Sequence, residues 1–254
     1  MKSISPELWN EIEKILPKKK CNIGRPEKDL KQTFLGIMYI LKNGSLWHEL
    51  PEKFGKPSTV HGKFMKWCRF GIFQKVIKTA RKYYIQRKKH KSWYAFDTLV
   101  KKAPLASFSG NNPTDRGKKG VKQTILVDEK GAPLYVDLAP ANVHDSKLLK
   151  PIISKLRKTK RKRILAADSA FDAKMLYEIC DSKNIKLDAA TNIRRSPNKP
   201  KHYPQDRWIV ERTFGWLSWY RGLKICWAKS KISHLAFLQI ACSIQLFKMS
   251  GVFV

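Results

Sequence analysis

The spacing of hydrophobic residues predicts helices through the first 90 residues of the chain. Apolar side chains recur there at three- and four-residue intervals, which places them on one face of an α-helix. Asp29 opens the second helix, and Ser58 caps the third. The inner face of the third helix is formed by Val60, Phe64 and Trp67. The fourth helix leads into a basic stretch, residues 81–91, which we interpret as a linker.

From Trp93 onward the hydrophobic pattern changes to alternating strands and helices. Three strands are predicted first, with the turn Asp128–Gly131 between the second and the third. Asp145 begins a helix, and βα units follow it. The predicted strands are 93–100, 123–127, 133–138, 163–168 and 185–189, and the later helices are 145–156, 173–182, 207–220 and 233–248. This order predicts an α/β domain over residues 91–254, preceded by a small all-α domain over residues 1–90.

Composition adds a strong electrostatic constraint. The chain has 254 residues, and 52 Lys and Arg against 20 Asp and Glu give a formal net charge of +32. Hydrophobic residues at 43% supply a buried core, which excludes a wholly disordered basic tail. A surface this basic attracts a polyanion, and the excess is shared by both halves of the chain. We therefore expect a long nucleic-acid duplex contacted by both domains.

The chain is expected to be soluble and cytosolic, without a membrane partner. Its first residues contain acids where a secretory signal needs an apolar run, and the stretch 235–247 is shorter than the roughly 20 residues of a membrane span. The five cysteines show no metal-ligand spacing, which argues against a zinc site.

Three acids stand where neighbouring residues do not explain them. Asp97 lies within an apolar strand, Asp168 follows another, and Glu211 lies on a helix beside small residues. Burying a lone carboxylate costs several kcal/mol unless a cation or hydrogen bonds compensate it. Three carboxylates are hard oxygen ligands of the kind that binds Mg²⁺ with substrate phosphates. For each acid an ordinary ion pair is the competing interpretation, and an RNA-binding role would explain the charge but not these positions.

Several basic groups are candidate DNA contacts, although each also fits an ordinary solvated surface. The cations predicted to point outward from the third helix suggest a helix-turn-helix arrangement. A loop containing Asp115 precedes the second strand, and a dense basic run extends from Lys155 to Arg163. His144 and Asp145 follow the third strand, where they either line the site or, for Asp145, cap a helix. The third-helix and loop candidates are His61, Lys63, Lys66, Arg69, Arg116, Lys118 and Lys119.

These residues resemble a known family. The order Asp97, Asp168, Glu211 on this succession of elements is similar to the DDE transposases with a ribonuclease H-like core, and the flanking blocks resemble the IS5 group of bacterial insertion-sequence transposases. The matching blocks are Trp47–Pro51 with Phe54-Gly55, Phe96–Thr98, Asp115–Gly120, Ala141–Asp145, Ala167–Asp172 and Val210–Trp216.

The resemblance implies a fold, a reaction and a site. The fold is a ribonuclease H-like mixed sheet in the order βββαβαβα, and Asp97, Asp168 and Glu211 are its metal-binding catalytic triad. The triad holds Mg²⁺, with Mn²⁺ as a possible substitute and two ions expected. The reaction is phosphodiester cleavage at transposon ends, followed by transfer of the 3′ hydroxyl into target DNA. Arg207 matches a Tyr-Arg-Glu-Lys pattern of related transposases, and with Arg212 it completes the predicted DNA contacts.

The expected partners are double-stranded DNA, comprising terminal inverted repeats and target, and further copies of this chain on that DNA. Two alternatives remain open. One is a catalytically decayed or repurposed copy that holds DNA without cutting it, since Ser218 stands where the pattern has Lys. The other is a structure-specific nuclease on the same fold.

Overall fold

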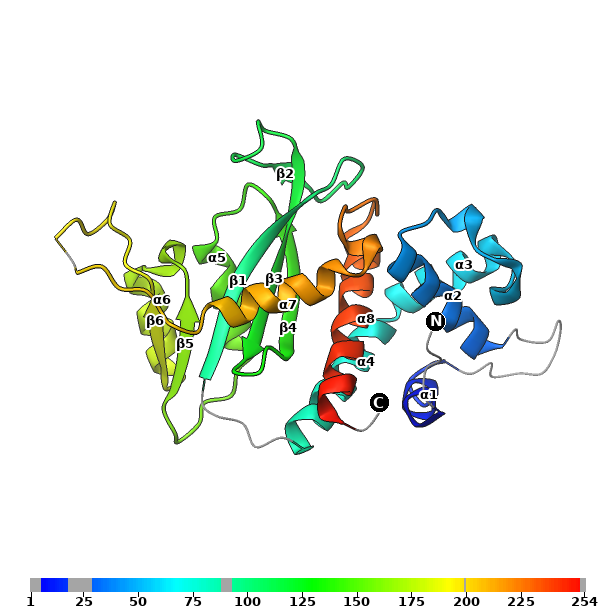
Figure 1. Ribbon diagram of the computed structural model, residues 1–254, viewed down its shortest axis with the longest axis horizontal. Coiled ribbons are helices and arrows are strands. Elements are labelled where there is room, and N and C mark those ends of the chain that lie inside the picture. Colours follow the sequence, from blue (N-terminus) through cyan, green and yellow to red (C-terminus); the bar gives the residue numbers. More distant parts are fainter. Residues whose placement is uncertain (1–5, 18–28, 88–92, 199, 252–254) are drawn as a thin grey trace. The chain divides into compact units, whose positions relative to one another are not determined.

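The chain folds into two units (Figure 1), which we describe from a computed structural model covering residues 6–17, 29–87, 93–198 and 200–251. Residues 1–88 and 217–254 form the first unit, and residues 89–216 form the second. The first unit contains α1 (Pro6–Glu13), α2 (Leu30–Asn43), the short 3₁₀ helices η1 (Trp47–Glu49) and η2 (Glu52–Phe54), α3 (Pro57–Arg69), α4 (Ile72–Arg87), η4 (Arg221–Leu223) and α8 (Lys231–Ser250).

The predicted helices of the first unit are present, with two corrections. Asp29 caps α2 as predicted, because its carboxylate accepts hydrogen bonds from the backbone amides of Lys31 and Gln32. The third helix is not capped by Ser58: it begins at Pro57, whose fixed φ suits the first helical position. The predicted linker is helical as far as Arg87, since α4 continues its buried face through Tyr84. The remaining linker residues, 88–91, lie outside the described residues.

Residues 217–254 pack with the N-terminal helices, whereas the sequence pattern assigned them to the domain 91–254. The reason is apolar surface: α8 lies along α4, and Phe237 stacks on Phe64 with ring centroids 4.7 Å apart. Nearby, η4 approaches α2 so closely that a Cβ on Gly222 would lie 2.9 Å from the carbonyl oxygen of Leu41. Glycine at this position therefore permits the close packing of η4 on α2.

Among the described residues, α8 is the one helix long and apolar enough to cross a membrane. At 20 residues it is longer than the sequence pattern predicted, but 67% of its apolar window is buried inside the protein. Burial of this extent is typical of a core helix.

The second unit is built on a six-stranded mixed sheet. Its strands run in the order β2-β3-β1-β5-β6, and β4 also pairs with β3. The β1–β3 and β3–β4 pairs are antiparallel, and the β1–β5 and β5–β6 pairs are parallel. Its elements are β1 (Trp93–Lys102), β2 (Gly110–Asn111), β3 (Lys119–Asp128), β4 (Pro133–Pro140), α5 (Ser146–Ser154), β5 (Arg163–Ala167), η3 (Ser169–Phe171), α6 (Lys174–Ser182), β6 (Ile185–Ala189) and α7 (Trp208–Ser218). The predicted βββαβαβα succession is confirmed, with β2 as an additional short strand.

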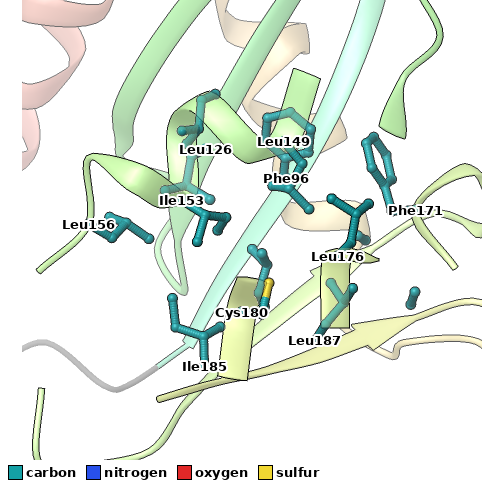
Figure 2. Close-up of a cluster of buried hydrophobic side chains, with 14 residues drawn as sticks. Phe96, Leu126, Leu149, Ile153, Leu156, Phe171, Leu176, Cys180, Ile185 and Leu187 are labelled. Carbon is teal, nitrogen blue, oxygen red and sulfur yellow. The ribbon is translucent and has the colours of Figure 1, made fainter. Parts of the chain in front are cut away.

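A hydrophobic core lies between this sheet and the helices α5 and α6 (Figure 2). Phe96 of β1 and Leu126 of β3 are register partners and are both fully buried there. Leu149 of α5 and Leu176 of α6 complete the layer from the helix side. Because successive side chains of a strand point to opposite faces, Asp97 is directed away from this core.

Candidate active site

Asp97 lies on the sheet face opposite the core, where it meets the start of α7. Its side chain is 17% exposed, and one carboxylate oxygen accepts a hydrogen bond from the backbone amide of Thr98 at 2.7 Å. The other oxygen accepts from Nη1 of Arg207 at 3.2 Å. The alternation of β1 therefore buries Phe96 on one face and presents a carboxylate on the other.

Asp168 stands beside Asp97 because their strands are parallel neighbours. The register pairs Ala95 of β1 with Ala166 of β5, and each acid follows two residues later on its own strand. Asp168 ends β5 and caps η3, with its carboxylate accepting the backbone amide of Ser169 at 2.6 Å. The carboxyl end of a parallel strand is where open α/β sheets place their ligands.

Glu211 lies in the first turn of α7 and is linked to Asp97 through Arg207. Arg207 directly precedes the helix, and its Nη2 lies 2.8 Å from a carboxylate oxygen of Glu211. The same guanidinium contacts Asp97, so one cation bridges two of the three predicted acids. The Glu211 side chain is 53% exposed and therefore open to solvent or a ligand.

The electrostatics of Asp97 connect all three acids. Burial raises the pKa of Asp97 to about 6, the Thr98 amide and Arg207 oppose the rise, and the charges of Asp168 and Glu211 add to it. The three carboxylates therefore influence one another, and Arg207 offsets the charge of two of them. The pKa of Asp97 stays raised because the effect of burial exceeds the opposing effect of this cation.

The donor chemistry of this cluster fits a hard divalent cation. All three groups offer carboxylate oxygens, and a bound cation would stabilise the charged form of Asp97, which burial and, to a smaller extent, the other two acids disfavour. Within the described part of the chain, no three acidic, His or Cys side chains stand close enough together to hold one ion. Arg207 instead makes the ionic contacts with Asp97 and Glu211 that a cation would make.

The predicted DNA contacts lie on α3, around the loop before β3, and at the start of α7, where Arg207 and Arg212 are found. On α3, His61, Lys66 and Arg69 are exposed, whereas Lys63 is half-buried. Arg116, Lys118 and Lys119 are exposed at the loop before β3, where Lys118 Nζ lies 3.8 Å from Asp115.

The Arg212 guanidinium is already engaged by contacts within the protein. Its guanidinium lies over the rings of Trp208 and Trp216, at 4.8 and 4.9 Å from their centroids, and donates to the carbonyl oxygen of Lys130. The hydrogen bond to Lys130 docks α7 onto the turn between β3 and β4, whereas both ring contacts lie within α7 itself.

Sequence reasoning missed a buried ionic network behind Asp97. Lys122 is 8% exposed, and its Nζ donates to the Asp145 carboxylate at 2.8 Å and to the Val143 carbonyl at 2.7 Å. The same Asp145 oxygen accepts from the Thr98 hydroxyl at 2.8 Å. Asp145 holds the N-cap position of α5, as the alternative interpretation predicted, but its side chain makes no cap hydrogen bond and binds Lys122 and Thr98 instead. A lysine inside the apolar strand 119–128 was the available sequence signal.

Comparison with known proteins gives matches over nearly the whole chain. The sequence profile of the transposase DDE domain family matches residues 62–246, and an IS4/5-type transposase profile (DUF4096) matches residues 4–77. A protein of Burkholderia cepacia, described as a transposase for insertion sequence element IS402, is 31% identical over 144 residues, covering 54% of this chain and 67% of that protein.

A solved structure has a similar fold. The piggyBac transposase, determined by cryo-EM as a synaptic complex with hairpin DNA, superimposes with a TM-score of 0.50 at 10% identity. The match covers 97% of this chain and 72% of that one. The ribonuclease H-like expectation is therefore confirmed at the level of the fold. Together with the two profiles, these findings show that the chain belongs to the DDE transposase family, of the IS4/IS5-like insertion-sequence type.

Proposed function

We propose that this protein is a transposase that uses divalent metal ions, held by Asp97, Asp168 and Glu211, to cleave its element's ends and join them to target DNA. Membership of the family makes the chain an enzyme of the polynucleotidyl-transferase and nuclease class. The observation that carries the specific proposal is Asp97: a buried carboxylate whose pKa is raised to about 6 by burial, with further contributions from the other two acids.

Metal ions bound by the triad would activate the attacking oxygen and stabilise the leaving oxygen of the phosphodiester. The protein's own residues position the reactants. The Thr98 amide fixes one oxygen of Asp97, and the Ser169 amide fixes one oxygen of Asp168. The Arg207 guanidinium lies between Asp97 and Glu211, and there it would bind a DNA phosphate in a bidentate manner.

The proposal is tested with a plasmid that carries the element's own inverted repeats. Wild type should nick and join this plasmid when Mg²⁺ or Mn²⁺ is present, and Asp97→Asn, Asp168→Asn and Glu211→Gln should each reduce both reactions to background. Each variant should still bind DNA, since it loses only a negative charge. Wild type that binds the ends but never cuts would make the protein a DNA-holding relic. Cutting without joining, on DNA that lacks the ends, would make it a nuclease.

We also propose that α3 contributes to recognition of the element's ends, and that two or more copies assemble there. Exposed Lys66 and half-buried Lys63 project from this helix. Replacing both by Gln should weaken binding to the ends more than binding to random duplex, as measured by fluorescence anisotropy. Equal losses would assign both residues to backbone contact alone. Sedimentation of the complex with end DNA should give the mass of more than one copy.

A further inference from the structure

The densest basic segment of the chain lies at the end of the sheet opposite the triad. This segment, which we call the basic loop, spans residues 155–162 and connects α5 to β5. Parallel pairing joins Trp93 of β1 to Ile164 of β5, and Arg163 of β5 to Ile185 of β6. The basic loop therefore lies at the edge of the sheet where these three strands begin (Figure 1). Asp168 of the triad directly follows the last residue of β5, at the other end of that strand. The five residues of β5 rise about 3.3 Å each, so the basic loop and the triad are separated by roughly 16 Å.

The basic loop is held in a defined conformation. The Asn184 side chain donates to the carbonyl oxygens of Thr159 and Lys160 at 3.0 and 2.9 Å. The buried side chain of Arg163, the first residue of β5, donates a hydrogen bond to the carbonyl oxygen of Arg157 at 2.6 Å. Thr159 adds a hydroxyl bond to the carbonyl oxygen of Arg161. The bonds use backbone carbonyls of the loop and therefore leave its charged side chains available.

Its cations are exposed and unpaired. No acid within the described residues forms an ion pair with any of them, in contrast to Lys122 or Lys118 elsewhere in this unit. The exposed side chains are Lys155, Arg157, Lys158, Lys160, Arg161 and Lys162, and Lys186 on the neighbouring β6 is exposed as well. Six cations within eight residues, fixed in place and free of counterions, match a polyanion with closely spaced charges.

We propose that the basic loop binds the phosphates of a second segment of duplex DNA, separate from the segment that lies at the triad. The inference rests on the proposed function for the identity of the first segment. The basic loop and the triad lie at opposite ends of β5, so a duplex that crosses the carboxyl end of the strand, perpendicular to it, leaves the amino end free for a second duplex. We assign DNA as the ligand because the density of positive charge on the basic loop exceeds what binding of an acidic peptide or of a single phosphate group requires.

The test uses the full chain in EDTA, so that no DNA chemistry is needed. The triple variant Lys158→Glu, Arg161→Glu, Lys162→Glu is compared with the control Lys75→Glu, Lys78→Glu, Lys82→Glu, which makes the same charge change on exposed positions of α4. The substituted loop side chains are exposed and unpaired, so both variants should keep the melting temperature of wild type. Protein is loaded onto a bead-bound 30-bp duplex, and capture of a free, fluorescent 30-bp duplex is then measured.

We expect the loop variant to lose at least about tenfold in capture of the free duplex, while its loading on the bead-bound duplex stays within twofold of wild type. The salt dependence should agree: each neutralised phosphate contributes about −0.9 to the log–log slope, so losing three contacts should reduce the slope of the capture step by about 2.7. The control should retain capture and slope.

Two results would overturn the proposal. Undiminished capture by the loop variant would mean that the basic loop binds no DNA. A parallel loss of loading and capture would mean that it contacts the same segment as the triad. Neither result depends on cleavage, so a failure of the transposase proposal would show separately, in the plasmid assay.

Discussion

At the scale of single residues, Asp97 is the clearest case in which the fold buries a group that carries a charge. Its strand must bury one face, and the alternation of β1 buries Phe96 while exposing Asp97 to the other two acids. Among the described residues, the side chain that offsets its charge by direct contact is Arg207. Because burial opposes its ionisation, a carboxylate in this position lowers the stability of the fold when it is charged.

The first prediction concerns the pH dependence of stability. Because the pKa of Asp97 is raised to about 6, the folded chain holds this proton more tightly than the unfolded chain does. The destabilising effect of Asp97 is therefore fully present above pH 6 and is lost as the pH falls through 6 towards 4. Asp97→Asn should raise the free energy of unfolding by about 1–3 kcal/mol at pH 8, since one pKa unit is worth about 1.4 kcal/mol.

Urea unfolding in EDTA measures this gap, which should be largest at pH 8 and absent near pH 4. Asp181→Asn, an exposed position on α6, is the matched control. A gap that stays constant with pH would show that the raised pKa is not the cause.

The second prediction concerns Arg207. Its guanidinium competes with any metal for Asp97 and Glu211. Arg207→Gln should therefore bind Mn²⁺ several-fold more tightly than wild type in the absence of DNA, as measured by electron paramagnetic resonance of free Mn²⁺. Arg194→Gln, an exposed arginine in the loop before α7, should bind as wild type does. Weaker binding by Arg207→Gln would mean that the arginine organises the carboxylates for metal instead of competing for them.

The sequence could identify the three acids because each lies in a context that disfavours it: Asp97 within an apolar strand, for example. The four-residue spacing of Arg207 and Glu211 also suggests their ion pair, but the sequence could not reveal the pairing of Arg207 with Asp97, 110 residues away. That pairing depends on where the loop before α7 crosses the sheet, and no local pattern encodes such a crossing.

At the scale of elements, one ionic network ties two strands to the start of α5. Lys122 of β3 and Thr98 of β1 both bind the Asp145 carboxylate, on the face of the sheet away from Asp97. Thr98 also supplies the backbone amide that fixes Asp97. The network therefore holds the part of β1 that carries the candidate catalytic aspartate.

The third prediction tests this network. Lys122→Met leaves Asp145 without its cation, and removing one partner of a buried pair costs about 3–5 kcal/mol; because Asp145 is partly exposed, we expect about 2–3 kcal/mol. Adding Asp145→Asn should recover at least half of the loss, as measured by urea unfolding. Lys147→Met, an exposed lysine on α5, should leave stability unchanged. Additive losses in the double variant would show that Lys122 and Asp145 do not interact.

Most elements could be predicted because hydrophobic spacing and turn residues agree locally. Asp128 and Gly131 are an example: the Asp128 carboxylate accepts the amides of Lys130 and Ala132, and Gly131 adopts φ of 81°. The role of Asp145 could not be predicted, because its partners lie 47 and 23 residues away and a cap would require the same residue type at the same place.

At the scale of the whole molecule, the chain is divided differently from its linear order. The sequence pattern separates residues 1–90 from 91–254, whereas α8 belongs with the N-terminal helices. Periodicity could locate α8 and its apolar face, but it could not say which neighbour covers that face. Only the packing of α8 along α4 decides this.

The fourth prediction follows from that packing. A fragment of residues 91–254 should aggregate, because it exposes the face of α8 that includes Phe237 and Ile240, which are 8% and 1% exposed in the intact chain. Co-expression with residues 1–90 should restore a soluble complex, as observed by size-exclusion chromatography, and a fragment of residues 89–216 should be soluble alone. A monomeric, soluble 91–254 fragment would contradict the assignment of α8 to the first unit.

The first unit is formed by two separate stretches of the sequence, and this sets the order in which the two units fold during synthesis. Domains usually fold as their residues leave the ribosome, N-terminal ones first. Here α4 emerges early but gains its partner only when α8, which ends at Ser250, has been translated. The unit that begins second in the sequence therefore completes its fold first, and α4 keeps an apolar face uncovered until α8 has been translated. A chain that lacks α8 would have a formed sheet and an unfinished helical unit, and its uncovered apolar face would make it a natural substrate for chaperones and proteases.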